Sequence, residues 1–209
     1  MPSQKYSAVV FDLGNVLINF DYNIAVNKFN KIEPGLGHQF LAHHKNNYHI
    51  HREFERGNIG IDEFVKLAVS GIDRKISDET FSKIYSDIFT ANNDVISLLP
   101  ILKQKYKLIL LSNTDPLHKK LGWDSYDFLS YFDHKVLSFE VGAVKPEVKI
   151  YKTVEELSEV APKKHLYIDD IAEYTEAAEK LGWDAVQFLN YSQLAAELIN
   201  RNVLTNVPL

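Results

Sequence analysis

Four groups of polar residues in this chain follow, directly or after a short loop, apolar runs typical of buried strands. They are Asp12, Ser112 with Asn113, Lys145, and the adjacent pair Asp169 and Asp170. Together they supply carboxylates, a hydroxyl, an amide and an ammonium, but no thiol, because the chain contains no cysteine. Hard oxygen donors suit phosphate chemistry with a divalent cation, and the lack of cysteine excludes thiol nucleophiles and thiolate metal sites.

The residue types themselves indicate a mechanism. Carboxylates that meet at one place raise one another's pKa unless a cation lies among them. Mg²⁺ prefers one or two carboxylates together with phosphate oxygens and water. With that ion bound, Asp12 is free to attack phosphorus and form an aspartyl-phosphate. Ser112 and the Asn113 backbone would hold phosphoryl oxygens while Lys145 offsets their charge, so we expect phosphoryl transfer with Mg²⁺ as cofactor.

These side chains can meet only if the runs before them are strands of one sheet. Five β-rich runs are present, at 5–11, 107–112, 135–139, 164–168 and 185–189. From the second run onward, segments with helical periodicity separate them, which predicts an α/β fold with a parallel sheet. Ligands of such sheets bind beyond the carboxyl ends of the strands, where the polar groups lie.

Between the first and second runs the pattern is helical, with Ser77 as the expected N-cap of one amphipathic helix. We therefore expect an inserted helical domain over 20–90 and an α/β core domain formed by 1–19 and 91–209. Pro100 predicts a kink or restart in the helical stretch that precedes the second run.

Composition limits the class of protein further. With 209 residues, 45% of them hydrophobic, the chain can bury one good core and a small satellite. No stretch approaches the roughly 18 apolar residues of a membrane span, and the first residues, MPSQKYS, lack the features of a signal peptide. The net charge of −5 disfavours a nucleic-acid partner. We expect a cytoplasmic monomer or homodimer that acts on a small molecule and has no membrane partner.

Four segments carry a resemblance to a known family. In chain order, FDLGNVL, LILLSNT, VGAVKPEVKIY and YIDDIAEYTEAAEKLG resemble the four motifs of the haloacid dehalogenase (HAD) superfamily. The helical insert resembles that superfamily's type 1 cap. The resemblance implies a Rossmann-like sheet with strand order 54123. It also implies a nucleophile at Asp12, a Mg²⁺ site made by Asp12, the Gly14 carbonyl, Asp169 and Asp170, and phosphoryl binding by Ser112 and Lys145.

The chain departs from the family pattern at Gly14. Phosphatases and mutases of the superfamily commonly carry an aspartate there as general acid and base, a role typically worth about 10² to 10⁴ in rate. Its absence leaves three hypotheses: a phosphatase without this side chain, a catalytically weak or dead phosphate-binding protein, or a dehalogenase. Dehalogenases lack the adjacent aspartates of YIDD, and a dead enzyme has no reason to retain the other groups. The phosphatase is therefore favoured.

The substrate expectation follows from the leaving group. DLGNV, and LSNT followed by His118, are similar to the bacterial α-glucose-1-phosphatase branch. A phosphate on an anomeric carbon has a good leaving group and needs less help from an acid. We therefore expect a sugar phosphate such as a hexose 1-phosphate, with His118 in a substrate-binding role, and a mutase is disfavoured. A response-regulator receiver has a similar set of groups, but in a different chain order and without the insert.

The helical insert contains further candidates. Five of the eight histidines lie within 38–51, and one of them could reach the leaving group if a cap closes, although an exposed polar face is the simpler interpretation for each. A zinc site is disfavoured because no carboxylate was found in an obvious i, i+4 arrangement with these histidines. Glu55 and Arg56 are candidates for contacting the substrate or the core, with Arg56 assigned to substrate binding. Tyr48 and Phe54 are expected in the core of the cap.

Overall fold

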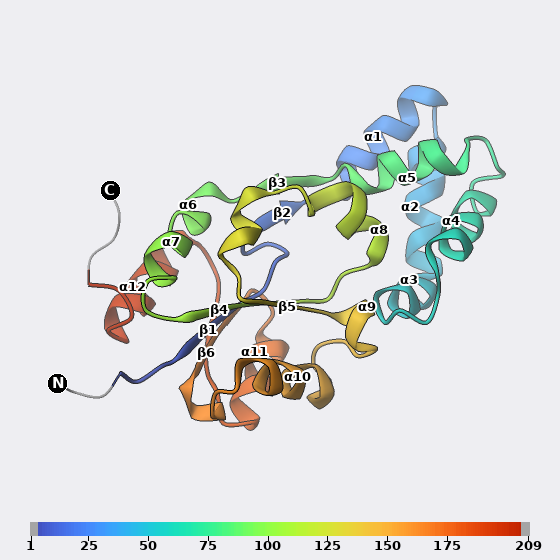
Figure 1. Ribbon diagram of the computed structural model, residues 1–209. Coiled ribbons are helices and arrows are strands. Elements are labelled where there is room, and N and C mark those ends of the chain that lie inside the picture. Colours follow the sequence, from blue (N-terminus) through green and yellow to red (C-terminus); the bar gives the residue numbers. More distant parts are fainter. Residues whose placement is uncertain (1–3, 206–209) are drawn as a thin grey trace.

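The computed structural model describes residues 4–205 and is built around a parallel five-stranded sheet (Figure 1). Its strands are β1 (Ala8–Phe11), β4 (Lys107–Ser112), β5 (His134–Leu137), β6 (His165–Asp169) and β7 (Asp184–Gln187). They lie in the order β5-β4-β1-β6-β7. Numbered one to five along the chain, the strands read 54123 from the β7 edge. The α/β fold and the strand order are confirmed.

Both faces of the sheet are buried under helices, which explains why β1 reads as a continuous apolar run. Val9 and Phe11 point into one core, and Ala8 and Val10 into the other. The first core is covered by α6 (Asn93–Ile96), α7 (Leu99–Leu102) and α12 (Tyr191–Asn200), and the second by α10 (Val148–Ser158) and α11 (Ala172–Lys180). Pro100 lies in the first turn of α7, so the helix restarts there as predicted.

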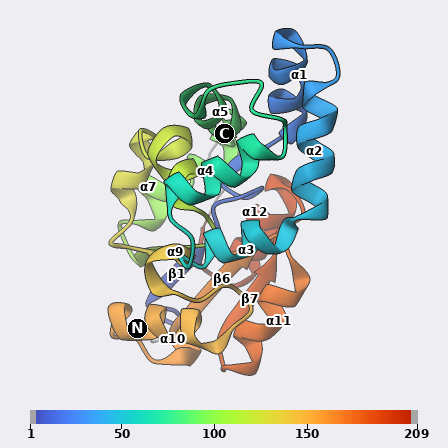
Figure 2. The ribbon, with the colours of Figure 1, turned by 90° about the vertical axis from the view of Figure 1, so that its right-hand side faces the viewer.

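Five further helices form a separate layer beyond the ends of the strands, here called the helical unit (Figures 1 and 2). They are α1 (Tyr22–Ile32), α2 (Leu36–Asn46), α3 (Tyr48–Glu55), α4 (Ile61–Ser70) and α5 (Asp78–Ser86). The unit has its own apolar core, in which Phe29, Phe40 and Phe81 are buried. Ser77 caps α5 as predicted, because its hydroxyl accepts a hydrogen bond from the Thr80 N–H. Helix α3 lies next to α9 of the α/β part.

A two-stranded antiparallel ribbon connects the two parts of the molecule. Strands β2 (Ile18–Phe20) and β3 (Phe89–Ala91) pair with each other, and the Asn92 side chain donates to the Val16 carbonyl at 2.9 Å. The sequence predicted no strand at either position. Each strand has three residues, which is too short to show an alternating pattern.

The third predicted strand ends earlier than expected. It stops at Leu137 because Ser138 begins a short helix, α9 (Ser138–Val141). The Ser138 hydroxyl exchanges hydrogen bonds of 2.9 Å with the N–H and carbonyl of Thr114, which fixes this turn against the end of β4. Short helical segments complete the fold: α8 (Pro116–His118), η1 (Lys119–Trp123), η2 (Asp127–Tyr131) and η3 (Pro162–Lys164). Within residues 4–205, no helix has the length and apolar character that crossing a bilayer requires.

Candidate active site

The ends of three neighbouring strands bring the predicted polar residues together. Asp12 follows β1, Ser112 ends β4 and Asp169 ends β6, and these strands are adjacent in the sheet. Lys145 enters from the loop between α9 and α10. Its Nζ lies 2.7 Å from Asp12 Oδ1 and 2.6 Å from Asp169 Oδ2. An ammonium buried to 1% exposure thus joins two carboxylates on adjacent strands.

The charges of this cluster do not balance. Burial lowers the pKa of Lys145, but Asp12 and Asp169 more than compensate and hold that pKa above its ordinary value. Burial also raises the pKa of Asp12, with Lys145 opposing the shift and Asp169 adding to it. With Asp170 included, three carboxylates face one ammonium, so the site carries excess negative charge that a cation would offset.

The donor set fits a hard divalent cation such as Mg²⁺. Asp12, Asp169 and Asp170 each offer a carboxylate oxygen, and these oxygens all lie within 4.8 Å of one another. Asp169 is held by Tyr167, whose hydroxyl donates to Oδ2, and by the Ile171 N–H, which donates to Oδ1 at 2.8 Å. Burial raises the pKa of Asp170, partly offset by Asn15. All three residues are oxygen donors of the kind that Mg²⁺ prefers.

Asn113 joins the second and third motifs. Its side-chain oxygen accepts a hydrogen bond from the Lys145 N–H at 2.7 Å, and its amide donates to the Lys145 carbonyl at 3.2 Å. This side chain therefore fixes the loop that carries Lys145. Ser112 is 2% exposed, and its hydroxyl makes only a long contact of 3.4 Å with the Asn113 carbonyl among the described residues. The hydroxyl is therefore available to bind an oxygen of a ligand.

Two adjoining cavities of about 170 Å³ each lie between the strand ends and the helical unit. The lining of the outer cavity includes Asp12, Lys145, Asp170, Arg52 and Tyr174. The lining of the inner cavity includes Ser112, His44, His51, His118, Tyr22 and Trp123. The residues that line both are Gly14, Phe20, Tyr48, Glu55 and Asn113. A ligand can therefore extend from Asp12 into the inner cavity.

Trp123 gives the inner cavity an unused hydrogen-bond donor. The side chain lines the cavity and is 1% exposed. In the described part of the chain its indole N–H has no hydrogen-bond partner. A buried donor without a partner costs about 1–3 kcal/mol, which a ligand oxygen would recover.

His118 is held on both ring nitrogens. Nδ1 lies 2.7 Å from Asp115 Oδ2, and Nε2 lies 3.2 Å from the carbonyl oxygen of Tyr85. Both partners are hydrogen-bond acceptors, so both ring nitrogens are engaged by protein groups. The ring also stacks on Tyr85 at 4.2 Å. His118, predicted to bind substrate, therefore links the loop after β4 to α5, although its ring borders the inner cavity.

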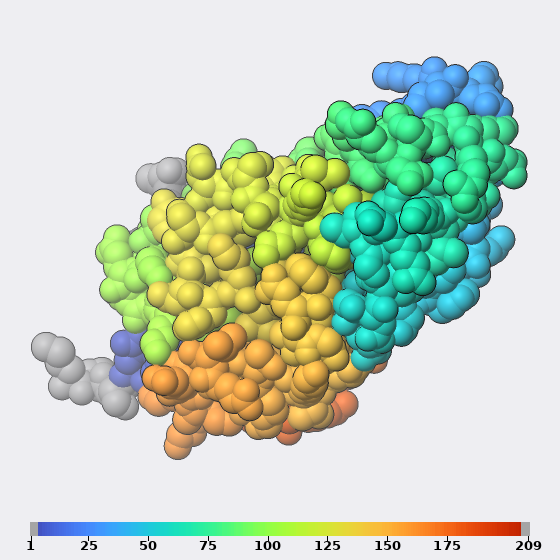
Figure 3. All heavy atoms as spheres, turned by 45° about the vertical axis from the view of Figure 1, so that its right-hand side comes forward, coloured from blue at the N-terminus to red at the C-terminus, as the bar shows by residue number. Residues whose placement is uncertain are grey.

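The arginine at the outer cavity is Arg52, one helical turn before the predicted Arg56. Arg56 forms an ion pair of 2.6 Å with Glu147 instead, and within residues 4–205 it lines neither cavity. This pair joins the helical unit to the α/β part, where Figure 3 shows the two surfaces in contact. Arg52 donates to Glu55 at 2.8 Å. The sequence could not distinguish the two arginines because the outcome depends on which face of α3 meets the sheet.

Two aromatic residues of α3 differ in environment. Phe54 is buried as expected and stacks on Phe64 at 4.1 Å. Tyr48 was expected in the same core, but it is half exposed and lines both cavities. The expectation for Tyr48 was wrong because it lies on a different face of the helix from Phe54.

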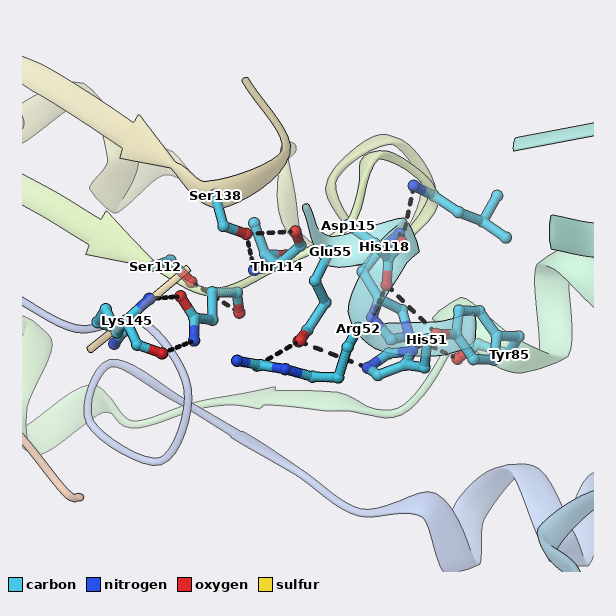
Figure 4. A network of polar contacts seen from close by, with 12 residues as sticks. His51, Arg52, Glu55, Tyr85, Ser112, Thr114, Asp115, His118, Ser138 and Lys145 are labelled. Atoms are coloured by element: carbon cyan, nitrogen blue, oxygen red, sulfur yellow. Dashed lines mark hydrogen bonds and ion pairs between the residues drawn. The ribbon is translucent and has the colours of Figure 1, made fainter. Parts of the chain in front are cut away.

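A buried polar network crosses from α3 to the loop after β4 (Figure 4). His51 Nε2 lies 3.5 Å from Glu55 Oε1, and His51 Nδ1 lies 3.1 Å from the hydroxyl of Tyr85. That hydroxyl donates to Asp115 Oδ2 at 3.2 Å. The statement that these histidines have no carboxylate at i, i+4 was wrong, since Glu55 follows His51 by four residues.

Gly14 borders both cavities, and the space beside it is partly taken. A Cβ added to Gly14 would lie 3.2 Å from the ring of Phe20. This is tight, but Phe20 is 42% exposed and is the end of a flexible side chain. The Phe20 ring therefore lies close beside the position where the second acid's side chain would begin.

Comparison with known proteins identifies related enzymes. A model of the haloacid dehalogenase-like hydrolases matches residues 6–182. A D-ribitol-5-phosphate phosphatase from Bacteroides thetaiotaomicron is 29% identical over 205 residues, which cover 91% of this chain and 95% of that protein. A phosphorylated carbohydrates phosphatase from Thermotoga maritima is 24% identical over 190 residues, covering 86% of this chain and 83% of that protein.

The fold has matching solved structures. A crystal structure of a HAD family enzyme from B. thetaiotaomicron in complex with magnesium has a TM-score of 0.79 at 28% identity, covering 91% of this chain and 98% of that one. The same enzyme in complex with magnesium and inorganic phosphate has a TM-score of 0.75 at 27% identity, covering 90% of this chain and 98% of that one.

Proposed function

The chain belongs to the haloacid dehalogenase-like hydrolase family, and we propose that it is a Mg²⁺-dependent phosphatase of small phosphorylated sugars and polyols. The observation that carries the proposal is the buried cluster of Asp12, Lys145 and Asp169, of which Asp12 and Lys145 line the outer cavity. Its donor set fits a divalent cation and leaves a carboxylate placed for attack. The phosphatase relatives and the magnesium and phosphate complexes of the B. thetaiotaomicron enzyme support the same activity.

The residues at the strand ends have different roles in the proposed phosphoryl transfer. A carboxylate oxygen of Asp12 attacks phosphorus and forms the aspartyl-phosphate, and water then hydrolyses that bond. Lys145 orients Asp12 and offsets charge on the phosphoryl oxygens, and the Ser112 hydroxyl donates to one of them. When bound by Asp12, Asp169 and Asp170, with the Gly14 carbonyl as a further ligand, Mg²⁺ supplies positive charge for the phosphoryl group.

The inner cavity supports a polyhydroxylated leaving group. Its lining includes the aromatic side chains of Tyr22, Tyr48 and Trp123, and the Trp123 indole N–H has no partner among the described residues. Such a wall offers hydrogen bonds to hydroxyl groups and contact for the carbon chain. Glucose 1-phosphate and ribitol 5-phosphate both belong to the proposed class. The leaving-group argument from Gly14 alone would favour phosphates with good leaving groups, such as hexose 1-phosphates.

We further propose that residues 20–90 act as the cap of this site and that 1–19 with 91–209 form the core, of which 1–3 and 206–209 lie outside the described residues. The β2–β3 ribbon is the proposed hinge. The helical unit contributes Tyr48, Arg52 and Glu55 to the cavities, so its movement would open and close the site.

A substrate screen tests the function. Released phosphate is measured for sugar 1-phosphates, sugar 6-phosphates, polyol phosphates and nucleotides, with Mg²⁺ and after chelation by EDTA. We expect turnover of sugar and polyol phosphates that EDTA abolishes and added Mg²⁺ restores. Phosphate binding without any turnover would instead favour a phosphate-binding protein, and undiminished activity after chelation would contradict the metal site.

A further inference from the structure

The two cavities fix where the bond to be broken must lie. The phosphoryl group belongs beside Asp12 and Lys145 in the outer cavity, with Ser112 reaching it from the adjoining wall of the inner cavity, and the organic group extends further into the inner cavity. The oxygen that joins them therefore passes the residues that line both. Among these shared residues Glu55 and Tyr48 are titratable, and Glu55 alone is a carboxylate.

We propose that Glu55 is the general acid and base of this reaction and that His51 is a positioning residue that supplies and recovers its proton. The inference rests on the proposed phosphatase function. It assigns to the cap the proton transfer that Gly14 cannot perform, because a glycine has no side chain and Phe20 occupies the adjoining space.

His118 is not available for this role. Both of its ring nitrogens are engaged, one by Asp115 and the other by the Tyr85 carbonyl. A proton donor must reach the leaving oxygen directly or through one water. Glu55 lines both cavities from α3. His51 lies at its Oε1 and Arg52 donates to its Oε2, but each carboxylate oxygen has a second lone pair that can take part in proton transfer.

The hydrogen-bond pattern indicates which atom of His51 exchanges the proton. The Tyr85 hydroxyl has one hydrogen, which it donates to Asp115, so it accepts from His51 Nδ1–H. Nδ1 therefore keeps its hydrogen, and Nε2, which faces Glu55, is the site that gains or loses one. In the view of Figure 4 Glu55 lies between Lys145 on one side and His51 on the other.

Electrostatics place the proton on His51 before substrate binds. Burial lowers the pKa of His51, but contact with Glu55 outweighs it, so the pKa lies above its ordinary value. Burial raises the pKa of Glu55, but His51 and then Arg52 outweigh it and hold that pKa low. The charged and titratable groups around the pair include Arg52, His44, Tyr22, Tyr48, Tyr85, Asp115 and Tyr174.

The proton balance closes over one turnover. As the Asp12 carboxylate bonds to phosphorus, the bond from phosphorus to the leaving oxygen breaks. That oxygen departs with the electron pair and takes a proton from Glu55, which receives one from His51 Nε2. In the second step a water oxygen bonds to phosphorus and the bond to Asp12 breaks. The water's proton passes to Glu55 and on to His51, which restores both groups.

A positioned acid would remove the preference for good leaving groups that Gly14 alone predicts. An enzyme with a positioned acid does not depend on a good leaving group, so phosphates of primary alcohols become substrates. Ribitol 5-phosphate and hexose 6-phosphates then compete with hexose 1-phosphates on the fit of the inner cavity.

The test is Glu55→Gln, with Glu53→Gln as matched control. Glu53 lies on the same helix, contacts Arg56 and Asn58, and within residues 4–205 lines neither cavity. For ribitol 5-phosphate we expect Glu55→Gln to lower kcat/KM by about 10² to 10⁴, the value of positioned proton transfer. For p-nitrophenyl phosphate, whose leaving group departs without a proton, we expect a change below about fivefold. Glu53→Gln should leave both values unchanged.

Equal losses on the two esters, or no loss on either, would overturn the inference while the phosphatase function stood. A wild-type enzyme inactive on all esters in Mg²⁺ would instead contradict the proposed function itself.

The variant His51→Gln provides a second test of the inference. In the wild type, kcat/KM for ribitol 5-phosphate should fall as pH rises through the raised pKa of His51. This descending limb of the pH profile should be absent from His51→Gln, and it should also be absent when p-nitrophenyl phosphate is the substrate. An unchanged limb in His51→Gln would exclude His51 as the proton source.

Discussion

The carboxyl ends of β1, β4 and β6, here called the rim, and helix α3 face the same two cavities, but different forces hold their side chains in place. Asp12, Ser112 and Asp169 lie at the ends of paired parallel strands, so the sheet register alone sets their spacing. His51 and Glu55 share a face of an eight-residue helix, which reaches the site only through the packing of the helical unit. In the proposed mechanism the phosphoryl chemistry thus depends on the sheet, whereas the proton chemistry depends on the packing of the helical unit.

One buried carboxylate, that of Asp115, connects the rim to α3 through Tyr85. Asp115 caps α8 through the N–H groups of Leu117 and His118, pairs with the His118 ring and accepts from Tyr85 of α5. Because Tyr85 also contacts His51, the orientation of the His51 ring depends on Asp115, which lies in the loop after β4.

The largest expected effect is at the rim. Asp12→Asn should lower turnover of every ester by on the order of 10⁴- to 10⁶-fold, as when the nucleophile of a covalent enzyme is removed. The fold should persist, because Lys145 keeps Asp169 as its partner. Phosphate release and circular dichroism check the two statements, and substantial activity in a folded variant would show that the rim does not provide the nucleophile.

The next largest effect is a loss of stability on substitution of Asp115, which connects the rim to α3. Asp115→Asn breaks the buried contact of Asp115 with the His118 ring, and we expect a loss of about 3–5 kcal/mol in unfolding free energy. Urea denaturation of the variant and of wild type measures it. The pKa of Asp115 is held low by His118 against the effect of burial. Its stabilisation is therefore present above its unfolded pKa and is lost as pH falls through its lower folded value. A variant as stable as wild type at neutral pH would refute this connection.

A smaller effect separates the inner cavity from the outer one. Trp123→Phe removes the free N–H, and we expect the KM for a polyol phosphate to rise by about 2- to 12-fold, equivalent to about 0.5–1.5 kcal/mol. Inhibition by inorganic phosphate, which occupies the outer cavity, should not change. Equal weakening of both would mean that Trp123 supports the whole site and not the organic group.

The smallest effect is expected at Arg56. Its ion pair with Glu147 is partly exposed, and such pairs contribute about 0.2–1 kcal/mol. Arg56→Ala should change kcat/KM by less than about threefold, in contrast to Arg52→Ala at the outer cavity. A large increase in KM for Arg56→Ala would restore its predicted role in substrate binding.

The same contrast explains what could be predicted from the sequence. Strand ends are visible as apolar runs followed by Asp12, Ser112 or Asp169, so the fold class and the rim followed directly. The face that α3 presents depends on contacts between distant segments, and Arg56 was therefore assigned in place of Arg52. The i, i+4 pair of His51 and Glu55 is present in the sequence, whereas the strands of the β2–β3 ribbon are too short to show a pattern.

The most direct test of the divided site is the amount of phosphorylated Asp12 in Glu55→Gln. The variant is mixed with Mg²⁺ and either p-nitrophenyl phosphate or ribitol 5-phosphate, quenched in acid, and analysed by mass spectrometry. We predict that the aspartyl-phosphate accumulates with the aryl ester, because the rim still forms it while no base activates water, and that it does not accumulate with the alkyl ester. Equal phosphorylation by both esters, or phosphorylation at a residue other than Asp12, would contradict the account.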